Sequence, residues 1–196
     1  EHGGYQHALV IGAETLSKMM DWTDRSTCVL FGDGAGAAVL SASKEDGILS
    51  MVQGSDGFRG DVLNCMARKV NNPYKKSDTA LSYVSMNGQE VYRFAVKTVP
   101  KAVTDAVEKA GLQLEEIDLF LLHQANYRII EAVSKRLGQP MEKFPTNLEE
   151  CGNISAASVP ILLDNVNNHG MMRKGMKIVL AGFGAGLTWG ATVINW

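Results

Sequence analysis

From residue 88 to the C-terminus, apolar residues alternate between the spacing of helices and the short continuous runs of buried strands. This spacing predicts a helix over 88–110 that ends at Gly111 and is kinked or broken at Pro100. The other elements predicted are a strand over 117–122, helices over 127–137 and 156–167, and an antiparallel hairpin of 177–180 with 190–196. Such an order favours a layered α/β domain with a mixed, mostly buried sheet.

The first part of the chain also predicts strands. Residues 8–12 read Ala-Leu-Val-Ile-Gly, which is typical of a strand buried on both faces. Residues 28–31 and 37–40 flank a glycine-rich segment and form either a hairpin or one long, kinked strand. Because the first strand begins so abruptly, we expect further chain upstream of it. Residues 50–82 are polar and glycine-rich, and are predicted to form a long loop over the surface or over a site.

Composition excludes several classes of protein. The chain has 196 residues, 45% hydrophobic and 20% charged, which fits a soluble globular protein. Its net charge of -2 gives no basic field for nucleic acid. No apolar run approaches the roughly 18 residues of a membrane span and no signal peptide is visible, so we expect a cytoplasmic protein. The cysteines Cys28, Cys65 and Cys151 are widely spaced and indicate neither disulfides nor a zinc site.

His123 is the first candidate for chemistry. It directly follows a predicted buried strand, and ligand crevices open where such strands end. A histidine there can donate a hydrogen bond to a developing oxyanion or carry a proton. Its position alone leaves a purely structural role, with the ring tied to a carbonyl, equally open.

Two further segments are candidates. Asn153 leads into a helix of small residues, where Asn153 or Ser155 could simply be a helix cap. The glycines of segment 182–186 permit tight turns and expose backbone N–H groups, as an oxyanion hole requires, although such runs are weakly specific. The earlier segment 32–36 lacks the lysine of a phosphate-binding loop and is followed by no helix.

Taken together, these motifs are far more specific than any one of them. His123 lies in H-Q-A-N-Y-R-I-I, Asn153 in G-N-I-S-A-A-S-V-P, and both are framed by F-G-D-G-A-G-A-A-V-L and G-F-G-A-G-L-T-W-G. In order and spacing the chain resembles β-ketoacyl-acyl-carrier-protein synthase III over essentially its whole length. The resemblance implies a thiolase-like layered α/β fold, with residues 1–44 ending an N-terminal half and 45–196 forming the complete C-terminal half, and a homodimer.

The resemblance also implies an activity. Enzymes of this family are acyltransferases that condense acetyl-CoA, or another short acyl-CoA, with malonyl-acyl-carrier protein in type II fatty-acid synthesis, through a decarboxylative Claisen reaction. His123 and Asn153 match the two donors that stabilise the enolate, and Ala185 matches a backbone N–H of a second oxyanion hole. The family's nucleophilic cysteine matches none of the three cysteines here, so we expect the chain to be inactive by itself.

Other residues match positions that bind substrates and partners. Arg25 aligns with an arginine that stacks on the CoA adenine, Asn126 with a pantetheine contact, and Phe183 with a tunnel aromatic. For the acyl carrier protein, Arg128 resembles the key arginine, and a basic face is completed by Arg93, Lys135 and Arg136. The resemblance implies no metal and no cofactor beyond acyl-CoA and phosphopantetheine-carried substrates, and neither nucleic-acid nor membrane binding.

Two alternatives stay open. A related condensing enzyme of polyketide or hydroxymethylglutaryl-CoA type would share His123 and Asn153 but differ in its tunnel. A non-catalytic truncated half would keep the fold without the chemistry. An upstream cysteine at the start of a helix would favour an enzyme over the second alternative. Acyl-chain preference does not follow from this sequence.

Overall fold

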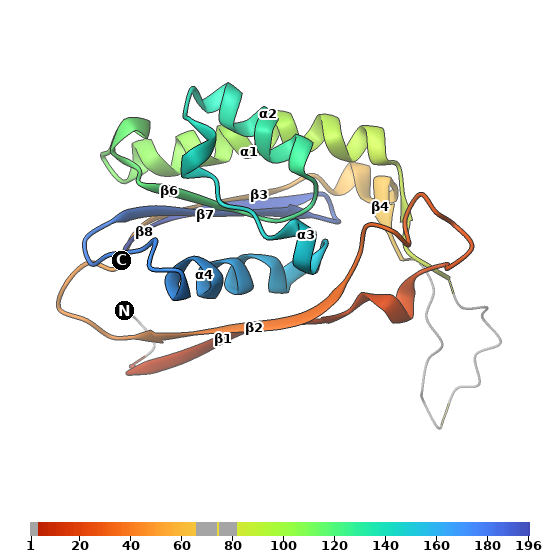
Figure 1. Cartoon of the computed structure of the whole chain (residues 1–196), viewed down its shortest axis with the longest axis horizontal. Helices are drawn as coiled ribbons and strands as arrows, with labels where there is room; N and C mark the ends of the chain where they lie inside the picture. The colour runs from red at the N-terminus through yellow and green to blue at the C-terminus, as the bar shows by residue number, and fades with distance from the viewer. Residues whose placement is uncertain (1–3, 66–73, 75–81) are drawn as a thin grey trace.

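The computed structural model describes residues 4–65, 74 and 82–196. Figure 1 shows the elements in successive layers, with helices above and below a sheet and a long ribbon underneath. The upper helices are α1 (Gly88–Lys109) and α2 (Tyr127–Leu137), and the lower ones are α3 (Leu148–Cys151) and α4 (Ser158–Asn168). The arrangement confirms the predicted layered α/β fold.

The central sheet has the order β3-β8-β7-β6, with β6 and β7 parallel and the other pairs antiparallel. These strands are β3 (Ile48–Ser55), β6 (Leu119–Leu122), β7 (Lys177–Gly184) and β8 (Thr188–Asn195). The ribbon pairs β1 (His7–Thr15) with β2 (Asp33–Ser41), and β4 (Leu63–Asn64) pairs with β5 (Ser85–Met86). Short 3-10 helices span Leu16–Met19, Gly57–Val62, Leu114–Glu116, Met141–Lys143 and Ser155–Ala157.

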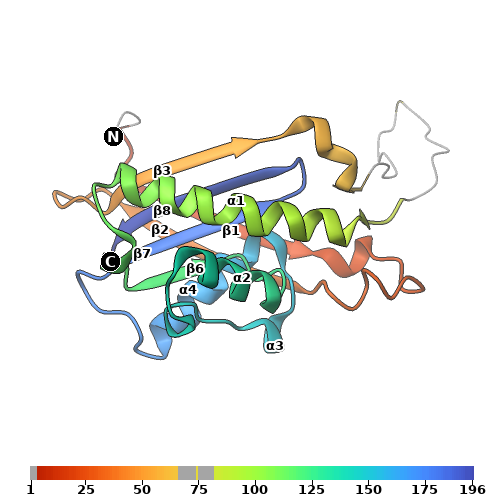
Figure 2. The same cartoon turned by 90° about the horizontal axis from the view of Figure 1, so that it is seen from above.

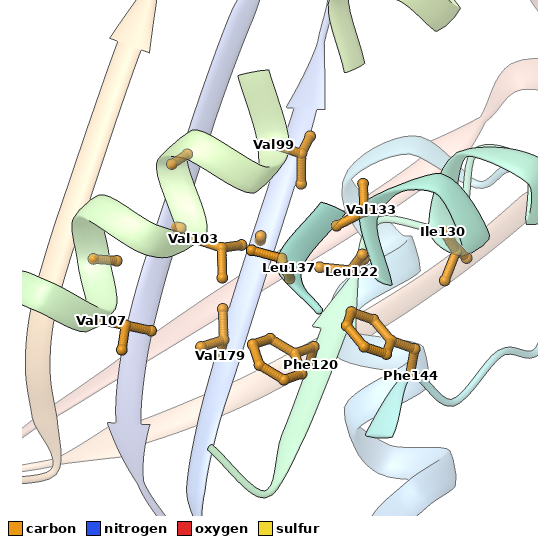
Figure 3. Close-up of a cluster of buried hydrophobic side chains, with 14 of the residues drawn as sticks. Val99, Val103, Val107, Phe120, Leu122, Ile130, Val133, Leu137, Phe144 and Val179 are labelled. Atoms are coloured by element: carbon orange, nitrogen blue, oxygen red, sulfur yellow. The ribbon is translucent and has the colours of Figure 1, made fainter. Parts of the chain in front are cut away.

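The core lies between the central sheet and the helices α1 and α2. Seen from above, α1 lies over the sheet and α2 lies beside α1 (Figure 2). Figure 3 shows Val103 of α1 and Val133 of α2 directed toward Phe120 and Val179 of the sheet. Phe120 also stacks on Phe144 with ring centroids 4.7 Å apart. Each such side chain contributes about 1.5–3 kcal/mol by leaving water, so this packing holds the ends of β6 and β7 in place.

The predicted helix over 88–110 is confirmed, but it runs through Pro100 without a break. Val99 and Val103, on either side of the proline, are buried at 2% and 0% exposure. Packing against the sheet therefore compensates for the one helical hydrogen bond that proline cannot make. Helix α2 has its predicted bounds and ends at Gly138, whose left-handed φ of 65° is favourable for glycine.

The strand predicted over 28–31 was wrong, and the loop predicted over 50–82 was wrong at its start. Residues 28–31 do not form a strand: they form a turn and one isolated bridge, so Cys28 lies half-buried in a turn. Strand β2 instead runs straight through the glycine-rich segment and pairs with β1. The predicted loop over 50–82 begins inside β3 and continues as a 3-10 helix, while positions 66–73 and 75–81 lie outside the described residues.

Strand β1 was also predicted to be buried on both faces, and it is not. Leu9 and Ile11 are each 61% exposed, because β1 pairs only with β2 and the described residues cover one face of the ribbon alone. On the covered face, a Cβ at Gly12 would overlap the backbone carbonyl of Ala156, and one at Gly36 would lie 2.9 Å from the nitrogen of Ile161. Glycine therefore lets the ribbon pack closely against the start of α4.

Candidate active site

A cleft of about 1110 Å³ opens at the carboxyl ends of β6 and β7. These strands are parallel, so the residues that follow them lie at the same edge of the sheet, where crevices form. Of the ten site residues expected from the sequence, six line this cleft: His123, Asn126, Arg128, Asn153, Phe183 and Ala185. The fold therefore brings together residues that lie up to 62 positions apart in the chain.

His123 follows β6 directly, and its backbone N–H donates to the carbonyl of Ala181 at 2.7 Å. Its ring meets the edge of Phe183 at 5.2 Å between centroids, and no side chain in the described residues hydrogen-bonds to it. Only 9% of the residue is exposed, and this burial lowers the pKa of His123 to about 4. The imidazole is therefore neutral at physiological pH and can donate through one ring nitrogen.

Asn153 is held by the segment that precedes β2. Its N–H donates to the carbonyl of Leu30 and its own carbonyl accepts from the N–H of Gly32, both at 2.9 Å. A Cβ at Gly32 would lie 2.5 Å from the carbonyl oxygen of Cys151, so a larger residue would push the two segments apart. The backbone of Asn153 is thus fixed from both sides at the wall of the cleft.

The alternative role of Asn153 or Ser155 as a cap of α4 is wrong. Helix α4 begins at Ser158 after Ala157, which makes no side-chain capping bond. The Oδ1 atom of Asn153 instead accepts the N–H of Ser155 at 3.0 Å, which fixes the rotation of the amide. Its Nδ2 group donates to no other group in the part of the chain that is described, and is available to a ligand.

Ala185 lies in the turn between β7 and β8. Ser155 is the only residue other than glycine with a positive φ among those described, so the φ of Ala185 is negative and its methyl group brings no strain. The Ala185 N–H has no acceptor within the described residues. Two backbone hydrogen bonds between Leu187 and Asp56, 2.8 and 2.7 Å long, attach this turn to the end of β3.

Asn126 and Arg128 lie at the start of α2. Asn126 is the N-cap residue, and its Oδ1 accepts the N–H of Arg128 at 2.8 Å. This bond satisfies one of the free donors of the helix end. The Arg128 side chain is exposed at the rim and forms no ion pair with any described residue.

The other four expected residues do not line the cleft. Arg25 is exposed in a turn that is stabilised by Asp21 and Asp24. Arg93 forms an ion pair with Glu90 at 2.6 Å, and Lys135 pairs with Glu131 at 2.8 Å. Arg136 is exposed on the last turn of α2. Local carboxylates thus partly neutralise the basic face that the sequence suggested.

Some residues of the cleft were missed by sequence reasoning. Cys65 lines it, and its thiol lies 3.4 Å from the carbonyl oxygen of Ser82. Trp189 also lines the cleft and packs edge-on against Phe94, with ring centroids 5.8 Å apart. The strand pattern of β8 signals that Trp189 lies in a sheet, but no local sequence signal places Cys65 at the cleft.

Within the described ranges there is no cluster of three or more His, Cys, Asp or Glu side chains that could hold a metal ion. None of the helices in those ranges has both the length and the apolar character needed to cross a membrane.

Comparison with known proteins identifies the family. The model for the 3-oxoacyl-[acyl-carrier-protein] synthase III C-terminal region matches residues 107–196, and the companion model named for the same synthase matches residues 1–57. The chain belongs to the 3-oxoacyl-[acyl-carrier-protein] synthase III family.

Relatives agree with this assignment. The β-ketoacyl-[acyl-carrier-protein] synthase III of Clostridium acetobutylicum is 49% identical over 99% of this chain, which spans 60% of that relative's length. The solved structure of the Thermus thermophilus synthase III superposes with a TM-score of 0.87 at 45% identity, over 97% of this chain and 59% of that one. A priming β-ketosynthase of the R1128 polyketide pathway gives a TM-score of 0.89 at 36% identity, over 98% and 58%. These solved folds confirm the expected thiolase-like architecture.

The burial of His123 predicts how stability depends on pH. An unfolded histidine titrates near 6.5 and the folded one near 4, so between these values the unfolded state binds more protons. Stability should therefore fall as the pH drops from 6.5 to 4, by on the order of 3 kcal/mol. Urea unfolding across this range should show a flatter pH profile for His123→Gln than for the unchanged protein.

The matched control is His169→Gln, which replaces an exposed histidine at the end of α4. It should keep the original pH profile. An unchanged profile in His123→Gln would contradict the lowered pKa of His123.

Proposed function

We propose that this chain supplies the enolate-stabilising part of the active site of an initiating condensing enzyme of type II fatty-acid synthesis. The reaction joins acetyl-CoA, or another short acyl-CoA, to malonyl-acyl-carrier protein and releases carbon dioxide, CoA and a 3-ketoacyl-acyl-carrier protein. The observation that carries the proposal is that His123 and Asn153 line one cleft, each with a side-chain donor that has no partner among the described residues. The family and the named relatives support the same reading.

The proposed chemistry needs neutral donors. When the carbon–carbon bond to the malonyl carboxylate breaks, its electron pair moves into the thioester and places negative charge on the carbonyl oxygen. A ring N–H of His123 and the Nδ2–H of Asn153 would donate to that oxygen. Because burial keeps His123 neutral, its N–H can stabilise the charge by hydrogen bonding without transferring a proton to the oxygen. Removal of one such donor typically lowers the rate about 10²- to 10³-fold.

The enolate carbon then attacks the carbonyl carbon of the acyl group carried on a cysteine. The tetrahedral oxyanion formed there would accept the free N–H of Ala185, whose negative φ lets alanine serve as glycine would. Collapse of this intermediate expels the cysteine thiolate and leaves the new carbon–carbon bond. Phe183, which meets the His123 ring, would line the route of the pantetheine arm together with Asn126.

We place the acylated cysteine outside this chain. Cys28 and Cys151 do not line the cleft, and the Cys65 thiol faces the carbonyl of Ser82. The chain spans 60% of the length of its Clostridium acetobutylicum relative, which leaves room for an upstream region in the whole protein. We propose that this region completes an N-terminal half ending near residue 44, a division supported by the end of β2 at Ser41 and the start of β3 at Ile48.

The acyl carrier protein is the proposed partner, and Arg128 is the proposed contact at the rim. It is exposed, lines the cleft, and is not neutralised by a described carboxylate. Arg93, Lys135 and Arg136 are weaker candidates because two of them are paired locally. Arg25 would contact CoA from its exposed turn. We also propose that the whole protein forms a homodimer and lies in the cytoplasm.

The polyketide priming β-ketosynthase among the solved relatives supports a second candidate. In that case the same donors and cleft would serve a carrier protein of polyketide synthesis. Condensation rates with the two kinds of carrier protein would separate these candidates.

The first experiment measures condensation of acetyl-CoA with malonyl-acyl-carrier protein. It compares this chain, a version extended upstream through the expected cysteine, and the extended version with His123→Ala. Activity should appear only in the extended protein and fall about 10²- to 10³-fold in the variant. No activity in a folded, dimeric extended protein would overturn the proposed function.

The partner is tested by Arg128→Glu in the extended protein. Reversing this charge should raise the KM for malonyl-acyl-carrier protein about tenfold and leave the acylation rate with acetyl-CoA within about twofold. Arg173→Glu makes the same charge change on an exposed arginine that precedes β7, away from the cleft, and should change neither. Equal effects of the two variants would show that Arg128 contributes only to the overall field.

A further inference from the structure

We propose that Gln124 is a positioning residue that holds the segments carrying His123 and Asn153 in register across the cleft. The inference rests on the proposed function and concerns the same site. Gln124 is not among the residues that line the cleft, and it would act through its two neighbours rather than on substrate.

Both ends of the Gln124 amide are engaged inside the protein. The side chain is 1% exposed. Its Nε2 donates to the carbonyl of Leu122 at 2.8 Å, and its Oε1 accepts the backbone N–H of Asn147 at 3.3 Å. One amide therefore joins two parts of the chain that are 25 residues apart in sequence.

These two anchor points lead directly to the proposed donors. Leu122 is the last residue of β6 and immediately precedes His123. Asn147 precedes α3, and its carbonyl accepts the N–H of Cys151 at 3.0 Å, two residues before Asn153. The Gln124 side chain and the single turn of α3 thus connect His123 to Asn153.

Among the described residues, Gln124 is the only one whose side chain hydrogen-bonds to Asn147. Its own Oδ1 and Nδ2 are buried and have no hydrogen-bond partner in the described part of the chain. The N–H that Gln124 accepts is therefore the polar contact that ties the start of α3 to the end of β6. Loss of this contact would release α3 from the end of β6, and the bridge to Leu30 and Gly32 alone would then hold Asn153 in place relative to His123.

A shift of Asn153 relative to His123 would affect one half of the reaction. Enolate formation needs His123 and Asn153 at the same oxygen, and a misplacement of about 1 Å can lower a rate 10²-fold. Acylation of the cysteine by acetyl-CoA would depend instead on the Ala185 N–H, which belongs to the turn fixed by Asp56 and Leu187. A positioning role therefore predicts unequal effects on the two steps, whereas general destabilisation would lower both.

The test replaces Gln124 with methionine, which has similar length and no hydrogen bonds, in the extended protein. Malonyl-acyl-carrier protein decarboxylation should fall about tenfold in kcat with KM within about twofold, while the acylation rate stays within about twofold. In a His123→Ala background the same substitution should lower decarboxylation less than about threefold, because one of the two aligned donors is already gone.

Gln139→Met is the matched control. Gln139 is also buried, and its Oε1 accepts from Lys143 at 3.1 Å at the far end of α2. It should leave the ratio of the two rates unchanged. If Gln124→Met fails to fold, Gln124→Leu removes the same two hydrogen bonds with a shorter side chain, and the same unequal effect is expected.

Equal losses in both steps, or no loss in a folded variant, would overturn the inference. Either result would leave the proposed function standing as long as the unchanged extended protein condenses its substrates. Failure of that protein to condense would instead remove the proposed function itself.

Discussion

The structure of the site depends on the backbone contact between Leu30–Gly32 and Asn153. Two hydrogen bonds of 2.9 Å make a short parallel bridge here, and the missing side chain of Gly32 allows the close approach. The bridge joins the segment before β2 to the loop before α4, and so connects the ribbon with the wall of the cleft. Without it, α4 would still pack under the sheet, but Asn153 would not be fixed opposite the end of β6.

The same site shows how stability and chemistry oppose each other. Burial of His123 removes its ring from water and lowers its pKa to about 4, which disfavours the folded state in mild acid. The gain is a donor that is neutral at physiological pH, lines the cleft, and has no side-chain hydrogen-bond partner in the described part of the chain. Asn153 is similar, since Ser155 occupies its oxygen and leaves its nitrogen available. Preorganised neutral donors of this kind are what a developing oxyanion requires.

Local patterns in the sequence predicted the second part of the fold well. The bounds of α2 follow from its apolar spacing and Gly138, and His123 could be placed at a strand end from the run before it. The same rules failed where the outcome depends on distant chain. The apolar run of β1 predicted burial, yet its burial depends on what covers the ribbon. The strand pattern at Cys28 was overridden by a turn in which Thr27 and Cys28 both donate backbone N–H bonds to the carbonyl of Asp24.

Within the site, the residue types were predictable and their contacts were not. The motif resemblance supplied His123, Asn153 and Ala185, which the fold brings to one cleft. It did not reveal that the side-chain oxygen of Asn153 accepts the N–H of Ser155, or that Arg93 forms an ion pair with Glu90. Nor did it reveal that the Gln124 side chain accepts the N–H of Asn147. The Gln124 contact joins residues 23 positions apart, for which no short pattern carries a signal. The other two contacts are local, but they depend on side-chain rotamers that the residue types alone do not determine.

We propose that His123 acts as a neutral hydrogen-bond donor in this reaction. The most direct test is the pH dependence of malonyl-acyl-carrier protein decarboxylation by the extended protein, taken as a ratio to His123→Gln at each pH. This ratio should stay level from about pH 5.5 to 8, because a buried histidine with a pKa near 4 does not change charge there. A ratio that rises as the pH falls through about 6.5 would show that the cationic imidazolium is the active form, and would contradict a neutral donor.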